Sequence, residues 1–399
     1  MLSFDDALTA LLGRIDALPS ETVALAEADS RILAEDVFAP FDLPTFSASA
    51  MDGYALDARG AEAAAPLRVS GESRAGAAVT PLTAGTAQRI STGAEVPAGA
   101  DRVVPQEQIE LVDGQIVLRA PSKAGQHIRR QGEDVARGAL TVTRGTRISP
   151  STLGLLASLD RATVQVGRRP RVHVLCTGDE LRAPGSPGRS GSIPDAISAA
   201  LAAQCRRSGA DVRGVSFAQD EAAQVERAVA EALVDVDLVL TVGGVSVGDH
   251  DWVRPALRSC GVELEFWKVA IKPGKPLAFG RAPQGGPWVL GLPGNPVSAL
   301  LTFALFGVPL LHALAGAARP RPSTQRLPLA RAVRHKEGRL EFLRARLDTS
   351  TEPPRVVPFE NQASGALVTL AQTEVLGCIP SELGDVAEGT WIDVLPWVF

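Results

Sequence analysis

Three apolar, β-branched runs in the middle of the chain each end abruptly at a loop of small residues and acids. They are VHVLCTGDEL (173 to 182), DLVLTVGGVSVGDHD (237 to 251) and PWVLGLPGNPVS (287 to 298). Strands that end in glycine beside carboxylates are typical of the carboxyl edge of an open parallel α/β sheet, where such loops bind polyanions. The pattern therefore predicts a polyanion site at one edge of a sheet.

Strand and helix patterns alternate from residue 169 to residue 315. The expected strands are VHVLCT, DVRGVSF, DLVLTV, VELEFWKVA, PLAFGR and PWVLGL, and the expected helices are ISAALAAQCRRSG, DEAAQVERAVAEALV, DWVRPALRSCG and VSALLTFALFGVPLLHALAG. This alternation predicts a doubly wound α/β domain over 169 to 317. The last run approaches membrane-spanning length, but it contains Pro309 and His312 and follows an anion-type loop, so we expect a buried helix.

The remaining segments predict three further domains. Residues 1 to 40 read as helix, turn and helix, and helical signals return at SPSTLGLLASL (149 to 159), so 1 to 40 plus 140 to 168 predict a helical N-terminal domain. Residues 41 to 139 contain short apolar runs separated by Gly- and Pro-rich turns, which predicts an inserted β-rich domain. After a Pro- and Arg-rich link, short strands over 325 to 399 predict a small C-terminal β domain.

Composition narrows the class of protein. A length of 399 residues exceeds one ordinary core, and a net charge of -5 argues against a general nucleic-acid surface. The four cysteines form no CxxC pair, which fits reduced thiols in a cytosol. The five histidines form no metal-binding motif. The acidic, helically periodic start does not resemble a secretion signal. We expect a cytoplasmic protein with no nucleic-acid or membrane partner.

Two of the strand-end loops have residues suited to phosphate and metal. GGVSVGD has phosphate-loop spacing, but Asp249 stands where a Walker loop needs its Gly-Lys-Ser/Thr ending, so we do not expect that nucleotide site. Its glycines would admit a ligand, Ser246 would donate a hydrogen bond, and Asp249 with Asp251 could hold a divalent cation. In TGDEL, the carboxylates of Asp179 and Glu180 could meet a phosphate through a metal ion. The alternative interpretation of GGVSVGD is a simple tight turn, and that of TGDEL is helix capping.

Two further segments suit an oxyanion. LPGNPVS leads into the long helix, so Gly294, Asn295 and Ser298 lie at a positive helix end with unpaired amides. Lys272 and Lys275 flank a stiff Pro-Gly turn. Two lysines held on such a turn suit an oxyanion, and a solvated surface turn is the alternative interpretation.

The β-rich segment has candidate residues of its own. The acids and hydroxyls of SASAMDGYAL, RISTGAEVPAGAD and IRRQGEDV are either functional or ordinary turn residues.

Taken together, these motifs resemble those of a known family. MDGYA, STGAEVPAGAD, RRQGEDV, PRVHVLCTGDEL, TVGGVSVGDHD, KPGKPLAFG and GLPGNPVSAL, in this order and spacing, closely resemble the MoeA-type molybdopterin molybdenumtransferases, the family that includes the gephyrin E domain. The likeness runs nearly end to end and includes EFLRARL and ENQASGAL near the carboxyl terminus.

The resemblance implies a function, an assembly and a set of partners. It implies the last step of molybdenum cofactor assembly, in which molybdate enters the dithiolene of adenylylated molybdopterin and AMP leaves with help from Mg²⁺ or another divalent cation. It also implies a homodimer of four-domain subunits, with an active site in a cleft shared by both chains. An upstream adenylyltransferase and recipient molybdoenzymes are the further partners that it implies.

The resemblance also assigns roles to individual residues. The implied catalytic residues are Asp52, Thr92, Asp134, Glu180, Asp220 and Asp251. The implied cation ligands are Glu180, Asp249 and Asp251, and the implied molybdate ligands are Lys272, Lys275, Ser298, Arg344 and Ser364. The implied substrate-binding residues are Thr177, Gly178, Asp179, Gly243, Gly244, Ser246, Gly248, Pro293, Gly294, Asn295 and Pro296.

One position departs from the family pattern. Ile197 stands where the family commonly has an asparagine that would hydrogen-bond the ligand or cap the following helix. If the position faces the ligand, Ile197→Asn should tighten substrate binding. Two alternative functions also stay open: a pterin-binding paralogue or scaffold without turnover, and molybdopterin adenylylation.

Overall fold

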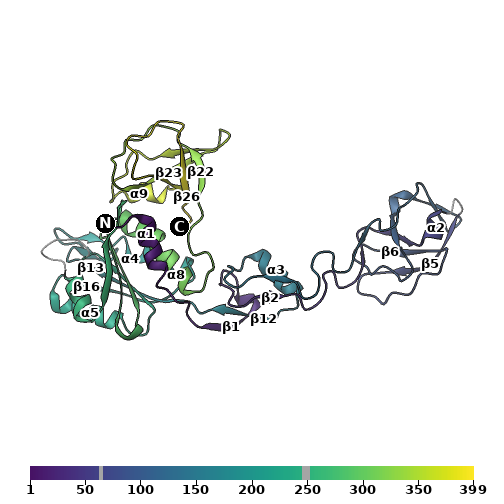
Figure 1. Cartoon of the computed structure of the whole chain (residues 1–399), viewed down its shortest axis with the longest axis horizontal. Coiled ribbons are helices and arrows are strands. Elements are labelled where there is room, and N and C mark those ends of the chain that lie inside the picture. The colour runs from purple at the N-terminus through teal and green to yellow at the C-terminus, as the bar shows by residue number, and fades with distance from the viewer. Residues whose placement is uncertain (63–65, 245–251) are drawn as a thin grey trace. The chain divides into compact units, whose positions relative to one another are not determined.

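The computed structural model describes residues 1–62, 66–244 and 252–399, and it divides into two compact units (Figure 1). Unit 1 comprises Met1–Glu35, Arg144–Leu153 and Ala162–Phe399, and unit 2 comprises Asp36–Thr143 and Gly154–Arg161. The four domain boundaries expected from the sequence stay a prediction.

The central feature of unit 1 is a six-stranded sheet in the order β16-β13-β17-β21-β20-β18. The strands are β13 (Arg171–Thr177), β16 (Asp211–Ala218), β17 (Leu238–Val242), β18 (Glu263–Lys268), β20 (Pro276–Arg281) and β21 (Trp288–Leu292). The first four strands of this order run parallel, and β20 and β18 continue the sheet antiparallel. The expected strands and their parallel core are therefore confirmed.

Helices cover both faces of this sheet, as the alternation of strand and helix predicts. They are α4 (Ser198–Arg207), α5 (Ala222–Ala232), α6 (Val253–Ser259), α7 (Pro296–Thr302) and α8 (Val308–Leu314). Val174 and Leu240 pack with α4, α7 and α8, whereas their strand neighbours Leu175 and Val239 pack with α5 and α6. Since successive strand residues point to opposite faces, the near-continuous apolar runs fit a sheet buried on both sides.

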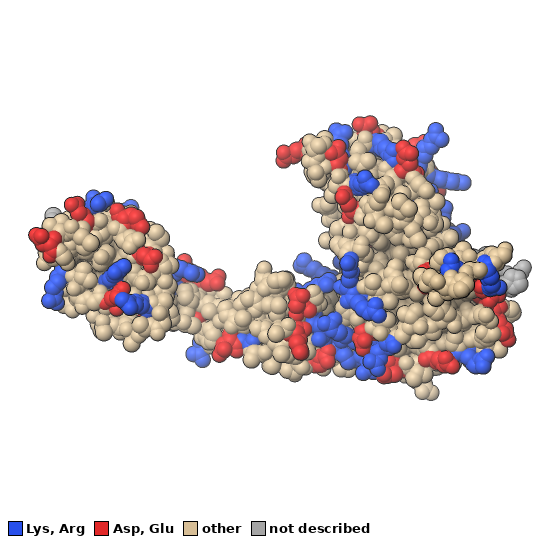
Figure 2. Space-filling view, turned by 180° about the vertical axis from the view of Figure 1, so that it is seen from behind, with Lys and Arg blue, Asp and Glu red and all other residues tan. Residues whose placement is uncertain are grey.

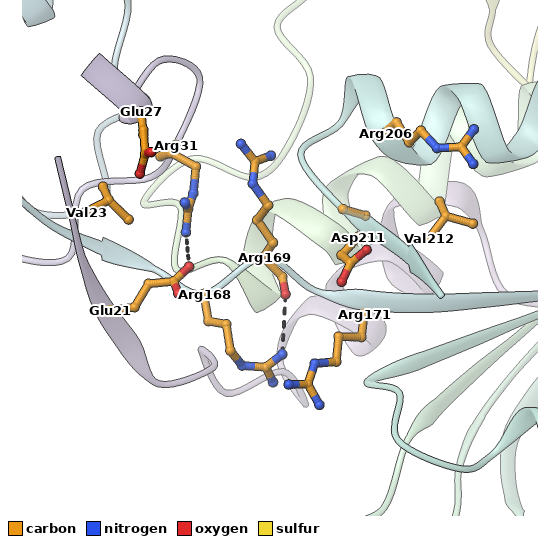
Figure 3. Close-up of a pocket in the computed structure, with 11 residues that line it drawn as sticks. Glu21, Val23, Glu27, Arg31, Arg168, Arg169, Arg171, Arg206, Asp211 and Val212 are labelled. Atoms are coloured by element: carbon orange, nitrogen blue, oxygen red, sulfur yellow. Dashed lines mark hydrogen bonds and ion pairs between the residues drawn. The ribbon is translucent and has the colours of Figure 1, made fainter. Parts of the chain in front are cut away.

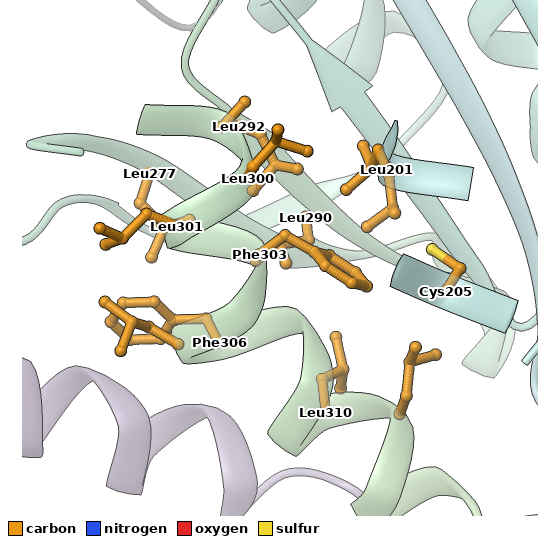
Figure 4. Close-up of a cluster of buried hydrophobic side chains, with 14 of the residues drawn as sticks. Leu201, Cys205, Leu277, Leu290, Leu292, Leu300, Leu301, Phe303, Phe306 and Leu310 are labelled. Atoms are coloured by element: carbon orange, nitrogen blue, oxygen red, sulfur yellow. The ribbon is translucent and has the colours of Figure 1, made fainter. Parts of the chain in front are cut away.

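The long apolar run forms a helix under this sheet. A π-helical turn, Phe303–Gly307, joins α7 to α8, so the helix spans Pro296–Leu314. It is the one described helix that is long and apolar enough to cross a membrane, yet 78% of its most apolar window is buried inside unit 1. Leu300, Phe303 and Phe306 pack in the cluster drawn in Figure 4. The expectation of a buried helix is confirmed.

The amino-terminal segment differs from the expectation in its second half. Helix α1 (Phe4–Leu12) forms as predicted and packs Leu8 and Leu11 in the same cluster as α8. The expected second helix is wrong, because Ser20–Ala24 forms strand β1 against β12 (Thr163–Gly167). Helix α3 (Pro150–Ser158) confirms the helical signal there, and the Ser149 hydroxyl accepts a hydrogen bond from the Thr152 amide at 3.2 Å.

The carboxyl-terminal region of unit 1 is a second sheet, in the order β19-β23-β25-β26-β22 with β24 beside β23. Its elements are β19 (Ile271–Lys272), β22 (Gln325–Pro328), β23 (Leu340–Asp348), β24 (Arg355–Pro358), α9 (Leu367–Ala371), β25 (Val375–Ile379) and β26 (Trp391–Pro396). The expected β region is confirmed. Strand β19, from the Lys-Pro-Gly-Lys segment, pairs parallel with β23 and so links this sheet to the α/β region.

Unit 2 is built on a six-stranded sheet in the order β7-β4-β6-β5-β9-β8. Its strands are β4 (Gly53–Leu56), β5 (Leu67–Ser73), β6 (Ala87–Ile90), β7 (Arg102–Pro105), β8 (Ile109–Val112) and β9 (Gln115–Leu118). Two-stranded pairs β2 (Val37–Phe38) with β11 (Leu140–Val142), and β3 (Ala48–Ser49) with β10 (Ile128–Arg129), complete the strands of this unit. The β-rich character expected for this part of the chain is confirmed.

Candidate functional site

The three strand-end loops of the α/β sheet lie in contact, because β13, β17 and β21 are neighbours in the sheet. Gly243 has a φ of 86°, and a Cβ there would lie 2.8 Å from the Thr177 carbonyl oxygen. A Cβ on Gly294 would lie 3.6 Å from the Gly243 Cα. The sequence therefore needs glycine at 243 to bring the three loops together at one edge.

The TGDEL loop gathers three of the predicted acids. The Asp179 carboxylate accepts a hydrogen bond from the Asp220 amide at 3.1 Å, which ties the end of β13 to the end of β16. Glu180 folds back over Gly178, where an added Cβ would lie 2.7 Å from Glu180 Oε2. Helix capping does not explain this loop, because the short strand β14 (Leu181–Arg182) follows it.

Ile197 is the N-cap residue of helix α4, and the preceding Asp195, a residue that sequence reasoning missed, binds the first amides of the helix. The Asp195 carboxylate accepts hydrogen bonds from the amides of Ile197 and Ser198, at 2.9 Å and 3.2 Å, and from the Ser198 hydroxyl. Ile197 is 6% exposed and packs in the main apolar cluster. Ile197 is thus a core residue at the N-cap position of α4, where it makes no side-chain cap bond, and its burial argues against a side chain that faces the ligand.

We consequently expect Ile197→Asn to destabilise unit 1 rather than tighten ligand binding. The substitution removes apolar burial and places an amide in an apolar cluster, which together cost about 3 kcal/mol of unfolding free energy. Ile193→Asn is a matched control, since Ile193 is 52% exposed and should change stability by less than about 0.5 kcal/mol. Urea denaturation of both variants checks this, and equal stability of the two would contradict the core assignment.

The LPGNPVS loop opens helix α7 beside a loop from the C-terminal sheet. Asn295 is the N-cap residue, Pro296 follows it, and the buried Ser298 lies in the first turn. The Val297 amide donates a hydrogen bond of 3.1 Å to the Ser364 carbonyl oxygen. The structure therefore brings Ser298 and Ser364 together at the positive end of the helix.

Arg344 is a buried cation at the same place. It lies on β23, is 1% exposed, and donates from Nη2 to the carbonyl oxygens of Asn361 and Ala363, at 2.9 Å and 3.1 Å. Its Nε has no partner, and no carboxylate of the described residues pairs with it. Burial lowers the pKa of Arg344. A guanidinium buried without a counter-charge favours binding of an anion there.

The Lys-Pro-Gly-Lys turn packs against the same helix. Gly274 has a φ of 103°, and a Cβ there would lie 2.3 Å from the Thr302 hydroxyl oxygen of α7. The Lys275 carbonyl oxygen accepts a hydrogen bond from the Val269 amide at 3.1 Å. Lys272 forms an ion pair of 2.8 Å with Glu341, a partner that the sequence did not predict.

Glu341 has a second partner, His335. Both side chains are almost fully buried, and His335 Nδ1 lies 2.8 Å from Glu341 Oε2. Because Glu341 already pairs with Lys272 through Oε1, its carboxylate accepts and His335 Nδ1–H donates. The sequence motifs single out neither residue, although Glu341 stands in EFLRARL three residues before Arg344.

Removal of the histidine should therefore destabilise the C-terminal sheet. His335→Leu leaves a buried carboxylate oxygen without its donor, which costs about 1 to 3 kcal/mol of unfolding free energy. His335→Asn is the control, because its amide nitrogen sits where Nδ1 does and can donate the same bond. Chemical denaturation should rank the asparagine variant above the leucine variant; the reverse order would exclude a structural role for this hydrogen bond.

In unit 2, two of the three predicted residues lie in contact. The Thr92 amide donates a hydrogen bond of 2.8 Å to Asp52 Oδ1, and both residues are exposed. The Asp134 amide donates a hydrogen bond to the Leu43 carbonyl oxygen at 3.0 Å. The hydrogen bonds described in unit 2 thus join Asp52 directly to Thr92.

Part of the predicted phosphate and cation site falls on residues 245–251. Ser246, Gly248, Asp249 and Asp251 lie outside the described residues, whereas Gly243 and Gly244 lie inside them. Among the residues that the structure does describe, no group of three His, Cys, Asp or Glu side chains could hold a metal ion. Of the three implied cation ligands, only Glu180 can therefore be placed.

A separate cavity of about 660 Å³ in unit 1 has five arginines in its wall (Figure 3). Three of them have acidic partners: Arg31 pairs with Glu21, Arg171 with Asp235, and Arg168 makes two bonds to Asp237 at 2.7 Å and 3.0 Å. Glu27 and Asp211 also line it. Acids likewise stand among the basic side chains on the face seen in Figure 2. Because its charges largely cancel, this cavity is a weaker anion site than the surroundings of Arg344.

Family models match the chain along most of its length. The "MoeA N-terminal region (domain I and II)" matches residues 2–159, the "Probable molybdopterin binding domain" matches 173–313, and the "MoeA C-terminal region (domain IV)" matches 326–397. The α/β sheet with its contacting strand-end loops lies within the second match. Fold and site thus define a multidomain α/β protein with a molybdopterin-binding type domain.

Individual relatives agree over the full length. The chain is 36% identical to a molybdopterin molybdenumtransferase of Haemophilus influenzae, covering 100% of this chain and 99% of that one, and 38% identical to molybdopterin molybdenumtransferase 2 of Mycobacterium tuberculosis, covering 94% of each. The crystal structure of a molybdopterin biosynthesis moeA protein from Pyrococcus horikoshii OT3 matches with a TM-score of 0.85 at 27% identity, covering 100% of both chains. The chain belongs to the MoeA family of molybdopterin molybdenumtransferases and is a transferase of molybdenum cofactor biosynthesis.

Proposed function

We propose that this protein inserts molybdate into the dithiolene of adenylylated molybdopterin and releases AMP, with a divalent cation such as Mg²⁺. The observation that carries the proposal is the buried Arg344, which has no acidic partner among the described residues and lies by the start of α7. A tetrahedral dianion such as molybdate needs several hydrogen-bond donors and net positive charge. The Arg344 guanidinium supplies the charge, and it supplies donors together with the first turn of α7.

The strand-end loops supply the other half of the proposed site. Gly243 and Gly294 expose backbone at the edge where Thr177 and Asp179 lie, so a phosphate-bearing ligand can approach closely. The oxyanion donors Ser298 and Arg344 stand next to the loop that opens α7. Phosphoanhydride and oxyanion would then be held side by side, which lowers the entropic cost of their reaction.

The acids would act on the charge that develops as AMP leaves. A divalent cation, when bound, would neutralise phosphate oxygens, and we expect Glu180, Asp249 and Asp251 to be its ligands. Asp220, whose amide is fixed by Asp179, would stay oriented toward the same loop edge. Asp52, Thr92 and Asp134 would add polar groups from unit 2.

The proposal extends to assembly and location. We infer a homodimer whose two chains together complete each active site, since the β-side acids and the α/β loops are expected to meet in one cleft. We also infer a cytoplasmic location, with an upstream adenylyltransferase as the source of substrate and molybdoenzymes as recipients of the product.

The test is a reaction with purified components. Intact protein is mixed with adenylylated molybdopterin, Mg²⁺ and molybdate, and AMP release is followed by chromatography. We expect AMP release that depends on molybdate and stops when the divalent cation is chelated. Binding of the pterin substrate without molybdate-dependent AMP release would favour a non-catalytic binding protein, and would exclude the proposed function.

A further inference from the structure

Lys272 does not stand free in the structure but is bound to a buried acid. It is the register partner of Glu341 in the parallel pair β19–β23, and its Nζ lies 2.8 Å from Glu341 Oε1. The lysine side chain is 47% exposed and the glutamate side chain 5% exposed. An ion pair with one buried member is screened by water much less than a surface pair, so it is a strong constraint on where the lysine reaches.

The direction of this constraint follows from the pleat of β23. Leu343 and Ala345 belong to the core of the C-terminal sheet, whereas Phe342 packs with the α/β core. Because strand side chains alternate, Glu341 shares the face of Leu343, and Arg344 shares the face of Phe342. The Lys272 ammonium is thus held on the face of β23 opposite to the guanidinium of Arg344.

The carboxylate that holds Lys272 is itself fixed. Glu341 Oε2 accepts from His335 Nδ1 at 2.8 Å, so both oxygens are engaged. The other ring nitrogen, Nε2, is buried without a partner, and the His335 amide is anchored to Asp385 at 2.9 Å. Such a carboxylate cannot follow the lysine when the lysine moves.

We propose that Glu341 withholds Lys272 from the oxyanion site, and that Lys272 exchanges Glu341 for the oxyanion when one binds beside Arg344. The inference rests on the proposed function, because the site is the one formed by Arg344, Ser298 and Ser364. Because Glu341 and the oxyanion compete for Lys272, the site binds the oxyanion less tightly. Weaker binding allows the oxyanion to leave the site for the pterin. Glu341 is therefore a positioning residue that sets affinity, and it does not touch the substrate.

A double-mutant cycle on molybdate binding tests the exchange. Isothermal titration calorimetry with sodium molybdate, without pterin, is carried out on the full chain and on Glu341→Gln, Lys272→Ala and the double variant. Glutamine cannot hold an ammonium by charge, so Glu341→Gln should lower the dissociation constant about tenfold, a coupling typical of a close charge pair. The gain should vanish in the Lys272→Ala background.

A control and a second variant keep the test decisive. Glu388→Gln makes the same charge change at an exposed pair with Arg355 and should leave the dissociation constant unchanged. If Glu341→Gln does not fold, Glu341→Met with His335→Leu replaces both buried partners by apolar groups and serves the same comparison.

The outcomes separate this inference from the function on which it rests. Unchanged or weaker binding by Glu341→Gln overturns the inference and leaves the oxyanion site intact. If Glu341→Gln still tightens molybdate binding in the Lys272→Ala background, the inference is also overturned. The effect would then come from a general change in electrostatic potential and not from release of Lys272. No molybdate binding by the unaltered protein overturns both the inference and the proposed site.

Discussion

Replacement of Arg344 by methionine should abolish molybdate-dependent AMP release while leaving the fold intact. Loss of charge-assisted hydrogen bonds to a dianion should raise the molybdate dissociation constant at least about 100-fold. The unfolding free energy should fall by no more than about 2 kcal/mol, because methionine removes the desolvation cost of a buried cation and this offsets the donors that the Asn361 and Ala363 carbonyl oxygens lose. Calorimetry with molybdate and chemical denaturation measure the two quantities.

Two further variants sharpen this expectation. Arg344→Lys keeps the positive charge but loses the planar guanidinium with its paired donors. Its affinity for molybdate should therefore lie between that of the unaltered protein and that of Arg344→Met. Arg326→Met removes an exposed arginine of the same sheet, 4.0 Å from Asp393, and should change neither quantity. A large loss of stability in Arg344→Met with no loss of affinity would mean that the guanidinium is structural.

Asp52→Asn should reduce AMP release by about 100-fold or more without unfolding unit 2. The Asp52 side chain accepts the Thr92 amide hydrogen bond through Oδ1, and an asparagine oxygen can accept the same bond. The substitution therefore removes the negative charge while it keeps the turn. A charge that acts in proton transfer or on the cation contributes factors of this size.

The comparison needs a matched acid in the same unit. Asp113 stands exposed in the turn between β8 and β9 with a φ of 49°, a conformation that asparagine tolerates, so Asp113→Asn should leave AMP release unchanged. Single-turnover AMP release with saturating molybdate gives both rates. Full activity of Asp52→Asn would remove Asp52 from the catalytic set and leave it as a turn residue.

The parts of the fold with long periodic runs could be predicted from the sequence. The strands of the α/β sheet are apolar on both faces and end at glycines, and their helices have long apolar stripes. Strand β1 could not be predicted in this way, because SETVA is short and largely exposed, and only its pairing with β12 makes it a strand. The burial of Ile197 is hidden from the sequence for a related reason, because it depends on the packing of α4 on the sheet.

The sequence predicts which residues form the candidate site, but it does not predict the contacts between them. Glycine and acid at strand ends located Thr177, Asp179, Gly243 and Gly294, since the carboxyl ends of parallel strands meet at one edge. The pairing of Lys272 with Glu341 depends on the register of β19 with β23, two strands far apart in the chain. The burial of His335 beside Glu341 depends on the same sheet, so no local pattern could reveal it.

The central claim is that molybdate and the adenylylated pterin react on this chain, and its most direct test is a count of both products. In a single turnover with Mg²⁺, molybdenum retained on the pterin is measured by mass spectrometry and AMP by chromatography. The account predicts equal amounts of the two, and neither product when molybdate is omitted. AMP released in full without molybdate, or molybdenum never found on the pterin, would contradict it.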